Sequence, residues 1–198
     1  MNYNTVIDYF DRKAKNYEAD SQSWPWSMVR KWEADAVQRM MGNVDGRSFI
    51  DLGAGSGYYV RIFKALGAVD ISAVDMSAKM LTGVPPGART YQADITSISL
   101  DDTFERILCT GALEFVVDPD AVFRNARVLA AEDCRMVVLV PNSNFFGWLY
   151  KLFHKSHGIA LNLFRPESLF DMADLAGWRV DRVERVAPFS LVACMSLR

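Results

Sequence analysis

The sequence contains few cysteines and few histidines. Its three cysteines among 198 residues stand far apart and lack the C-x-x-C spacing of many zinc and redox sites. We therefore expect reduced thiols that pack as small hydrophobic side chains. The two histidines, His154 and His157, stand in no cluster of ligating residue types, so the sequence predicts no metal site.

The sequence also lacks a strong excess of charge and any long hydrophobic run. Its formal net charge is −2 and it has no broad basic stripe, so neither nucleic acid nor an anionic membrane is expected to attract it non-specifically. No apolar run approaches the roughly 20 residues that cross a bilayer. Residues 1–12 mix charged and aromatic side chains, unlike a signal peptide. These absences favour a soluble, cytoplasmic protein.

What remains is the composition of an ordinary globular protein, with 51% apolar and 23% charged residues. The length suits one domain, and no repeat or long linker divides it.

The first forty residues predict two helices. In the first, apolar side chains fall mostly on one side (Val6, Ile7, Tyr9, Phe10 and Tyr17). The second begins near Pro25, ends at Gly42 and has an apolar stripe of Val29, Trp32, Ala36, Val37 and Met40.

From residue 48 onward, short apolar runs alternate with helical patterns. The runs predict strands over residues 48–52, 70–74, 88–93, 104–110 and 135–140. Helices are expected over residues 58–66, from the N-cap Ser77 to 81, and over 119–129, 145–153 and 166–176. The last two strands, 178–186 and 189–197, are too close for a crossover helix and should pair as an antiparallel hairpin.

This order of elements predicts an α/β fold. We expect a Rossmann-like, seven-stranded and mostly parallel sheet, with one antiparallel strand in the C-terminal hairpin and helices on both faces. Residues 1–198 would form one domain, made of a helical cap (1–42), an α/β core (48–141), a pair of helices (142–176) and the hairpin (178–198).

A glycine-rich loop joins the first strand to its helix. Glycines at 53, 55 and 57 let the backbone turn tightly and approach a ligand, and the helix behind them offers free N–H groups. Asp51 stands two residues before the first glycine. A dinucleotide fingerprint would require a further glycine at position 58, which is Tyr58.

This G-x-G-x-G segment with its preceding acid resembles motif I of the class I S-adenosylmethionine-dependent methyltransferases. Residues 109–119 resemble motif IV of the same family, in a variant reading G-x-L-E-aromatic-V-x-D-P. Phe10, Asp11, Ala14 and Tyr17 are similar to the F-D-x-x-A-x-x-Y opening of quinone-pathway and biotin-pathway methyltransferases. The resemblance covers almost the whole chain and is weakest over residues 142–176.

The resemblance implies S-adenosyl-L-methionine as cofactor, bound mainly by the core over residues 48–141. The loop would lie under its amino-acid end and Asp51 would help to hold its amino group. Asp75 would accept hydrogen bonds from the ribose diol, and Asp94 would accept one from the adenine amino group. The full set of expected cofactor residues is Asp51, Gly53, Ala54, Gly55, Gly57, Asp75, Met76, Asp94, Ile95 and Thr110.

Catalytic residues are harder to assign, because methyl transfer depends mostly on alignment and does not always need a base. The candidates are Glu114, which follows the fourth strand, Tyr17, which would close over the methyl group, and His154. For both histidines the alternative is an ordinary surface position. Many relatives carry a histidine at the position of Phe115, so this chain lacks a histidine that could act as a base there.

The helix over 145–153 has Phe145, Trp148, Leu149, Leu152 and Phe153 on one face. Two interpretations stay open: a core helix packed against the sheet, or a lid over an apolar or lipid-like substrate. We expect methyl transfer to a small molecule, with oxygen as acceptor. The alternatives are an NAD-type oxidoreductase and a non-catalytic protein that binds S-adenosylmethionine. No nucleic acid partner and no integral membrane segment are expected.

Overall fold

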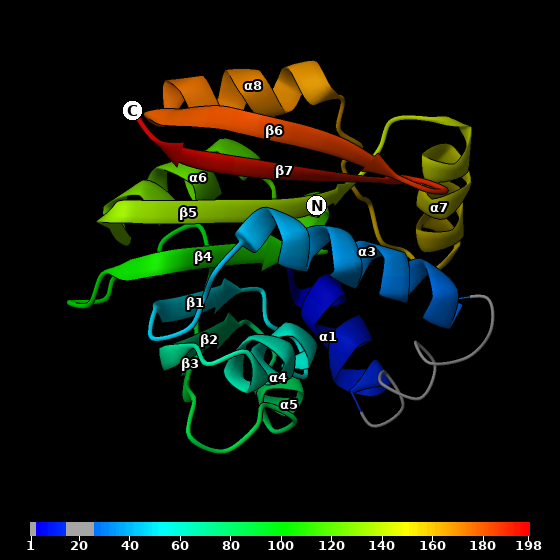
Figure 1. Ribbon diagram of the computed structural model, residues 1–198. Coiled ribbons are helices and arrows are strands. Elements are labelled where there is room, and N and C mark those ends of the chain that lie inside the picture. The colour runs from blue at the N-terminus through cyan, green and yellow to red at the C-terminus, as the bar shows by residue number, and fades with distance from the viewer. Residues whose placement is uncertain (1–2, 15–25) are drawn as a thin grey trace.

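A computed structural model describes residues 3–14 and 26–198 of the protein (Figure 1). Its seven-stranded sheet has the order β3-β2-β1-β4-β5-β7-β6. The strands from β3 to β5 are parallel, and β7 runs antiparallel to both β5 and β6. The predicted α/β fold with one antiparallel strand is therefore confirmed. The bounds are β1 Ser48–Leu52, β2 Val69–Asp75, β3 Arg89–Gln92, β4 Phe104–Thr110, β5 Ala130–Pro141, β6 Trp178–Val186 and β7 Ser190–Leu197.

Helices cover both faces of the sheet, as expected. α3 and α4 supply buried side chains to the core on one face, and α6 and α8 supply those on the other. α1 and α7 lie at the end of the sheet toward which the parallel strands point (Figure 1). The bounds are α1 Tyr3–Lys13, α3 Trp26–Met41, α4 Tyr58–Ala65, α5 Ala78–Leu81, α6 Pro119–Val128, α7 Phe145–Ser156 and α8 Pro166–Leu175, with a 3₁₀ helix, η1, at Leu113–Phe115.

The strand order places a topological switch point between β1 and β4. The chain runs outward from β1 to β3 and then crosses back to β4 on the other side of β1. The connections that follow β1 and β4 therefore leave in opposite directions and open a crevice at the carboxyl ends of these strands. The predicted glycine loop follows β1, so it lies at this crevice.

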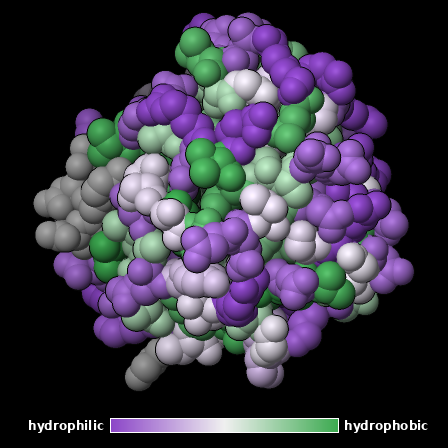
Figure 2. All heavy atoms as spheres, turned by 90° about the vertical axis from the view of Figure 1, so that its left-hand side faces the viewer, coloured by the Kyte–Doolittle hydropathy of each residue, from purple (hydrophilic) through white to green (hydrophobic). Residues whose placement is uncertain are grey.

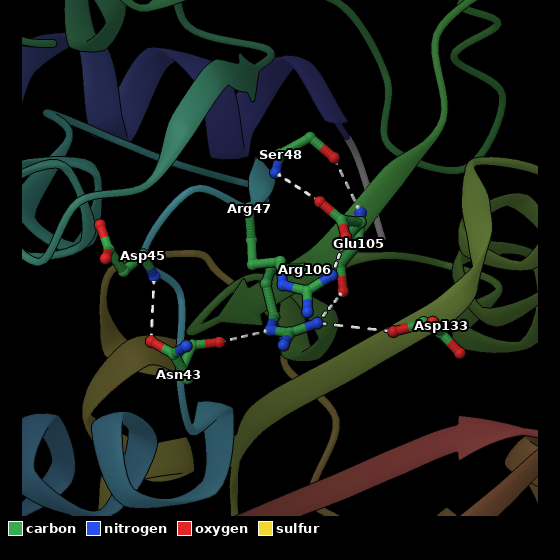
Figure 3. Close-up of polar contacts among 7 residues, drawn as sticks. All are labelled: Asn43, Asp45, Arg47, Ser48, Glu105, Arg106 and Asp133. Atoms are coloured by element: carbon green, nitrogen blue, oxygen red, sulfur yellow. Dashed lines mark hydrogen bonds and ion pairs between the residues drawn. The ribbon is translucent and has the colours of Figure 1, made fainter.

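At the opposite end, polar contacts fix the register of β1 against β4 (Figure 3). The N–H of Ser48 donates to Glu105 Oε2 at 3.1 Å, and the N–H of Glu105 donates to Ser48 Oγ at 3.0 Å. Arg47 pairs with Glu105, and Arg106 Nε donates to the carbonyl of Asn43 at 3.0 Å. This amino-terminal end of the sheet is mostly hydrophilic, with hydrophobic residues in small groups (Figure 2).

The structure differs from the sequence prediction in three places. β5 begins at Ala130 rather than at 135, because the polar pair Glu132 and Asp133 interrupts the apolar run that marks the strand. α7 continues three residues beyond 153, to Ser156. Trp32 does not belong to the buried stripe of α3; it is 43% exposed, whereas Ala36 and Val37 are fully buried. The remaining strand ends agree to within one residue.

The three cysteines are buried and form no disulfide, as expected. Across residues 3–14 and 26–198, no helix is both long and apolar enough to cross a bilayer.

Candidate active site

A cavity of about 710 Å³ lies at the carboxyl ends of the parallel strands. Its floor is the loop after β1 and the ends of β2 and β4, and η1 forms one wall. α1, α3 and α7 enclose the remaining sides. This is the position at which open α/β sheets bind their ligands.

The path of the glycine loop depends on the absence of a side chain at positions 53 and 55. Gly53 and Gly55 have φ angles of 85° and 53°, in the left-handed region that favours glycine. A Cβ atom on Gly53 would lie 2.4 Å from the Cβ of Ala112, and one on Gly55 would lie 3.1 Å from Met80 Cε. The N–H groups of Gly53 and Ala54 donate to the carbonyl of Val74 at 2.8 and 2.9 Å, which ties the loop to β2.

Gly57 has a different place from the other two glycines. It is the N-cap of α4, and a Cβ there would lie 3.0 Å from Val84 Cα and from Pro85 Cδ. Gly57 does not line the cavity. Its contribution is to let the loop between α5 and β3 pack against the start of α4.

Asp75 ends β2 and lines the cavity. Its Oδ2 accepts from the N–H of Gly55 and its Oδ1 accepts from the N–H of Ser77, both at 2.8 Å. These bonds hold the carboxyl group at the cavity, where its remaining lone pairs can accept from a ligand. Burial raises the pKa of Asp75, and the hydrogen bonds from Ser77 and Gly55 oppose that shift.

Asp51 lies beneath the loop rather than on the cavity wall. Its side chain is buried, and both carboxylate oxygens have no hydrogen-bond partner among the described residues. Burial, together with the nearby Asp75, raises the pKa of Asp51 to about 8. A buried carboxyl group without partners is costly, so this one is poised to accept a cationic partner.

The other expected cofactor residues divide into two groups. Met76, Ile95 and Thr110 line the cavity. Asp94 does not; its Oδ1 accepts from the N–H and the hydroxyl of Thr96, both at 2.8 Å, and so holds the turn after β3.

Among the catalytic candidates, Glu114 has the strongest position. It lies in η1, is 3% exposed and lines the cavity, and its Oε2 has no hydrogen-bond partner in the described part of the chain. Burial raises the pKa of Glu114 to about 8, with a smaller contribution from Glu33. Tyr17, another of the catalytic candidates, lies outside the described residues.

His154 is buried, so the surface position considered for it is wrong, whereas His157 is exposed. The His154 ring lies 4.5 Å from that of Tyr150 and 5.6 Å from that of Phe115, centroid to centroid. Burial lowers its pKa to about 4, with a smaller effect of His157, so the imidazole that lines the cavity is neutral at pH 7.

Glu33 on α3 is a cavity residue that the sequence interpretation missed. Its Oε1 accepts from the hydroxyl of Ser190 at 2.5 Å. Burial raises the pKa of Glu33, against the opposing effect of the Ser190 bond. The signal was present: Glu33 lies four residues from both Val29 and Val37, which places a carboxyl group within the apolar stripe of α3.

The helix α7 does not pack its apolar face against the sheet. Phe145, Trp148, Leu149, Leu152 and Phe153 are each between 42% and 67% exposed. The opposite side, with Gly147 and His154, is buried. The interpretation of this segment as an ordinary core helix is therefore wrong, because helical periodicity identifies an apolar face but not its direction.

The Rossmann-like sheet with an antiparallel seventh strand, its glycine loop and the carboxyl groups of β1 and β2 define a class I S-adenosylmethionine-dependent methyltransferase. A family model described as a methyltransferase domain matches residues 26–183, and the chain belongs to that family.

A curated relative is the ubiquinone biosynthesis O-methyltransferase of Bordetella avium (strain 197N), which is 23% identical over 125 residues. The match covers 59% of this chain and 52% of that protein, so it spans about half the length of the relative.

Solved structures agree in fold. The magnesium protoporphyrin IX methyltransferase of Synechocystis PCC 6803 with bound SAH has a TM-score of 0.80 at 14% identity, over the whole of both chains. A DhpI complex with SAM and HEP has a TM-score of 0.77 at 19% identity, over 98% of this chain and 97% of that one. A possible histamine N-methyltransferase of Thermotoga maritima has a TM-score of 0.74 at 18% identity, over 96% and 98%.

The residues present fit S-adenosylmethionine, the cofactor of this class. The unpartnered carboxyl group of Asp51 suits the cofactor's amino group, and Asp75 lies on the cavity with acceptor capacity for a diol. Gly53 and Gly55 present their backbone to the cavity, and a Cβ on either glycine would crowd Ala112 or Met80. The assignments of Asp51 to the amino group, of Asp75 to the ribose diol and of Asp94 to the adenine, as well as the role of Gly57, stay predictions.

Proposed function

We propose that the protein transfers a methyl group to an oxygen atom of a small molecule that has a largely apolar body. The observation that carries this proposal is Glu114: a buried carboxyl group on the cavity wall, with a free oxygen and a pKa near 8. A group with that pKa is partly ionised near neutral pH, and its carboxylate form can take a proton from a weakly acidic hydroxyl.

The cofactor supplies an activated methyl group on a sulfonium sulfur. The chain supplies alignment and proton transfer. In the proposed step, the carboxylate form of Glu114 would accept the proton of the acceptor hydroxyl while the oxygen takes the methyl group, whose bond to the sulfonium sulfur breaks so that SAH leaves. The step as proposed does not require a metal, because the methyl carbon is already electrophilic and the oxygen needs only deprotonation and alignment.

The rest of the cavity supports an apolar substrate body. Many of its lining side chains are aromatic or aliphatic and come from α1, η1, α7 and the turn before β7; among them are Val6, Tyr9, Phe10, Phe115, Phe153 and Phe189. The neutral imidazole of His154 lies among these rings. Such a lining favours an apolar or lipid-like molecule over a highly charged one.

Two measurements test this proposal. Calorimetry with S-adenosylmethionine, S-adenosylhomocysteine (SAH) and NAD should show binding of the first two and not of NAD; the reverse would favour an NAD-type oxidoreductase. Transfer of labelled methyl to a panel of matched apolar phenols and amines should label the phenols. Binding without transfer to any compound or cell extract would instead favour a non-catalytic binding protein.

The variant Glu114→Gln separates the role of the base from that of the pocket. We expect it to lower kcat for a phenol by about 10²- to 10⁴-fold while the affinity for SAH stays unchanged. An unchanged kcat would show that Glu114 is not the base, and preferential labelling of amines would overturn the oxygen acceptor.

A further inference from the structure

The apolar face of α7 is held in an outward orientation. The side chain of Asn144 caps the helix by accepting from the N–H of Gly147 at 2.8 Å, and it donates to the carbonyl of Pro188 at 3.1 Å. A Cβ on Gly147 would lie 1.9 Å from the carbonyl oxygen of Asn142, so the helix backbone packs directly on the preceding chain. The helix is thus anchored on one side and exposes six large apolar side chains on the other: Phe145, Phe146, Trp148, Leu149, Leu152 and Phe153. Phe153, at the edge of this face, also lines the active-site cavity.

This surface continues from α7 onto α3. Trp26, Met28 and Trp32 are each more than 40% exposed, and they line a second cavity of about 410 Å³ together with Phe146 and Leu149. The second cavity shares Trp26, Val29, Tyr150 and Phe189 with the active-site cavity. The exposed apolar surface therefore adjoins the entrance to the site, whereas the amino-terminal end of the sheet is mostly hydrophilic (Figure 2).

The charged residues of the segment that carries α7 are of one sign. Residues 142–165 contain no aspartate or glutamate, although the overall content of 24 acids in 198 residues would give about three. The same stretch contains Lys151, Lys155 and Arg165, all of them exposed. By the helical period, Lys151 and Lys155 lie along one flank of the apolar face. The net charge of −2 for the whole chain hides this local positive surface.

We propose that the outward face of α7 and the adjoining side chains of α3 dock on the headgroup region of an anionic lipid bilayer. Tryptophan and phenylalanine side chains favour the boundary between headgroups and acyl chains, and flanking lysines are attracted to anionic lipid. No helix within the described ranges can span a bilayer, so this contact is peripheral. The proposal does not depend on which atom accepts the methyl group.

Vesicle co-sedimentation of the full chain tests this contact. We expect binding to vesicles of equal parts phosphatidylglycerol and phosphatidylcholine, and much weaker binding to pure phosphatidylcholine. Leu152→Asp, at the centre of the exposed face, and the double variant Lys151→Glu with Lys155→Glu should each weaken binding at least about tenfold. The matched control Leu175→Asp changes an exposed leucine at the end of α8 and should bind like the unchanged protein.

Affinity for SAH, measured on the same preparations, checks that the variants are folded, because none of these residues lines the active-site cavity. Absence of binding to either vesicle, or equal binding by the α7 variants and the unchanged protein, would overturn the proposal. A concentration-dependent dimer that Leu152→Asp abolishes, without vesicle binding, would assign the surface to a second copy of this chain and would also overturn it.

Discussion

Asp51, Glu114 and Glu33 lie at or beside the cavity in surroundings that disfavour their charged forms. Burial raises the pKa of Asp51 and of Glu114 to about 8 each, and it also raises that of Glu33. Buried carboxyl oxygens are rarely left without partners, because each costs stability, yet both oxygens of Asp51 and Oε2 of Glu114 have none among the described residues. Their presence at one cavity is therefore best explained by a ligand and a reaction that use them.

The raised pKa of Glu114 makes stability depend on pH. The unfolded chain releases this proton near its ordinary value of 4.5, while the folded chain retains it up to about 8. Between these values the folded state binds more protons, so the free energy of unfolding falls as pH rises. Glu114→Gln removes the titration, and we expect a smaller fall between pH 5 and pH 8 in urea denaturation.

The matched control is Glu132→Gln on β5, where the side chain is exposed. This variant should retain the full pH dependence. Asp51 also titrates near pH 8, so some slope should survive in Glu114→Gln. Identical slopes in Glu114→Gln and the unchanged protein would show that Glu114 is not buried in its neutral form.

Single residues differed in how far the sequence could predict them. Asp75 follows a strand next to a glycine loop, and strand ends in such sheets meet at the ligand, so its place on the cavity could be predicted. Glu33 could not be placed so easily, because its cavity position depends on how α3 packs across the sheet. The burial of His154 likewise depends on the direction in which α7 turns.

At the scale of elements, the parallel strands were the most predictable part. Buried strands are short apolar runs bounded by turn residues, and that pattern is local to each strand. The start of β5 was missed because Glu132 and Asp133 are polar and lie in the irregular stretch of the strand, between the pairs Phe104–Ala130 and Arg106–Arg135. The outward face of α7 was missed for a different reason: periodicity is the same for a helix that faces the core and one that faces outward.

The pairing of β1 with β4 depends at its amino end on Glu105, which accepts from Ser48 N and pairs with Arg47 (Figure 3). These contacts lower the pKa of Glu105, so the stabilisation is present above its ordinary pKa and is lost as pH falls through the lowered value. Because Arg47 is 41% exposed, solvent screens the pair. We expect Glu105→Gln to lower the free energy of unfolding by roughly 0.5–1 kcal/mol at pH 7.

Urea denaturation at pH 7 and at pH 3 measures this effect. At pH 3 the difference between Glu105→Gln and the unchanged protein should shrink, because partial protonation of Glu105 then weakens the charge interaction in the unchanged protein. Glu167→Gln, an exposed position in the first turn of α8, is the control and should differ little at either pH. The same difference in the free energy of unfolding at pH 7 and at pH 3 would mean that packing rather than charge explains the contribution of this contact.

At the scale of the whole molecule, a ligand bound in the cavity should raise the free energy of unfolding of the whole chain. The loop after β1, the end of β2 and α1 all contribute to one cavity, and Asp11 of α1 accepts from the hydroxyl of Ser77 at 2.5 Å. A ligand that occupies this cavity binds the folded chain and not the unfolded one. At a concentration of 100 times its Kd, SAH should therefore raise the free energy of unfolding by about 2.7 kcal/mol.

Asp75→Ala tests whether SAH stabilises the protein by binding at the site described above. Loss of the carboxyl group removes an acceptor for the cofactor and the partner of Gly55 N–H, so we expect at least about a tenfold weaker affinity. At the same SAH concentration the stabilisation should then fall by about 1.4 kcal/mol, since each tenfold change in affinity corresponds to that amount. Asp101→Ala, at an exposed position outside the cavity, should keep the full effect. If NAD stabilised the chain and SAH did not, the cavity would hold a dinucleotide and the assignment of Asp51 and Asp75 to S-adenosylmethionine would fail.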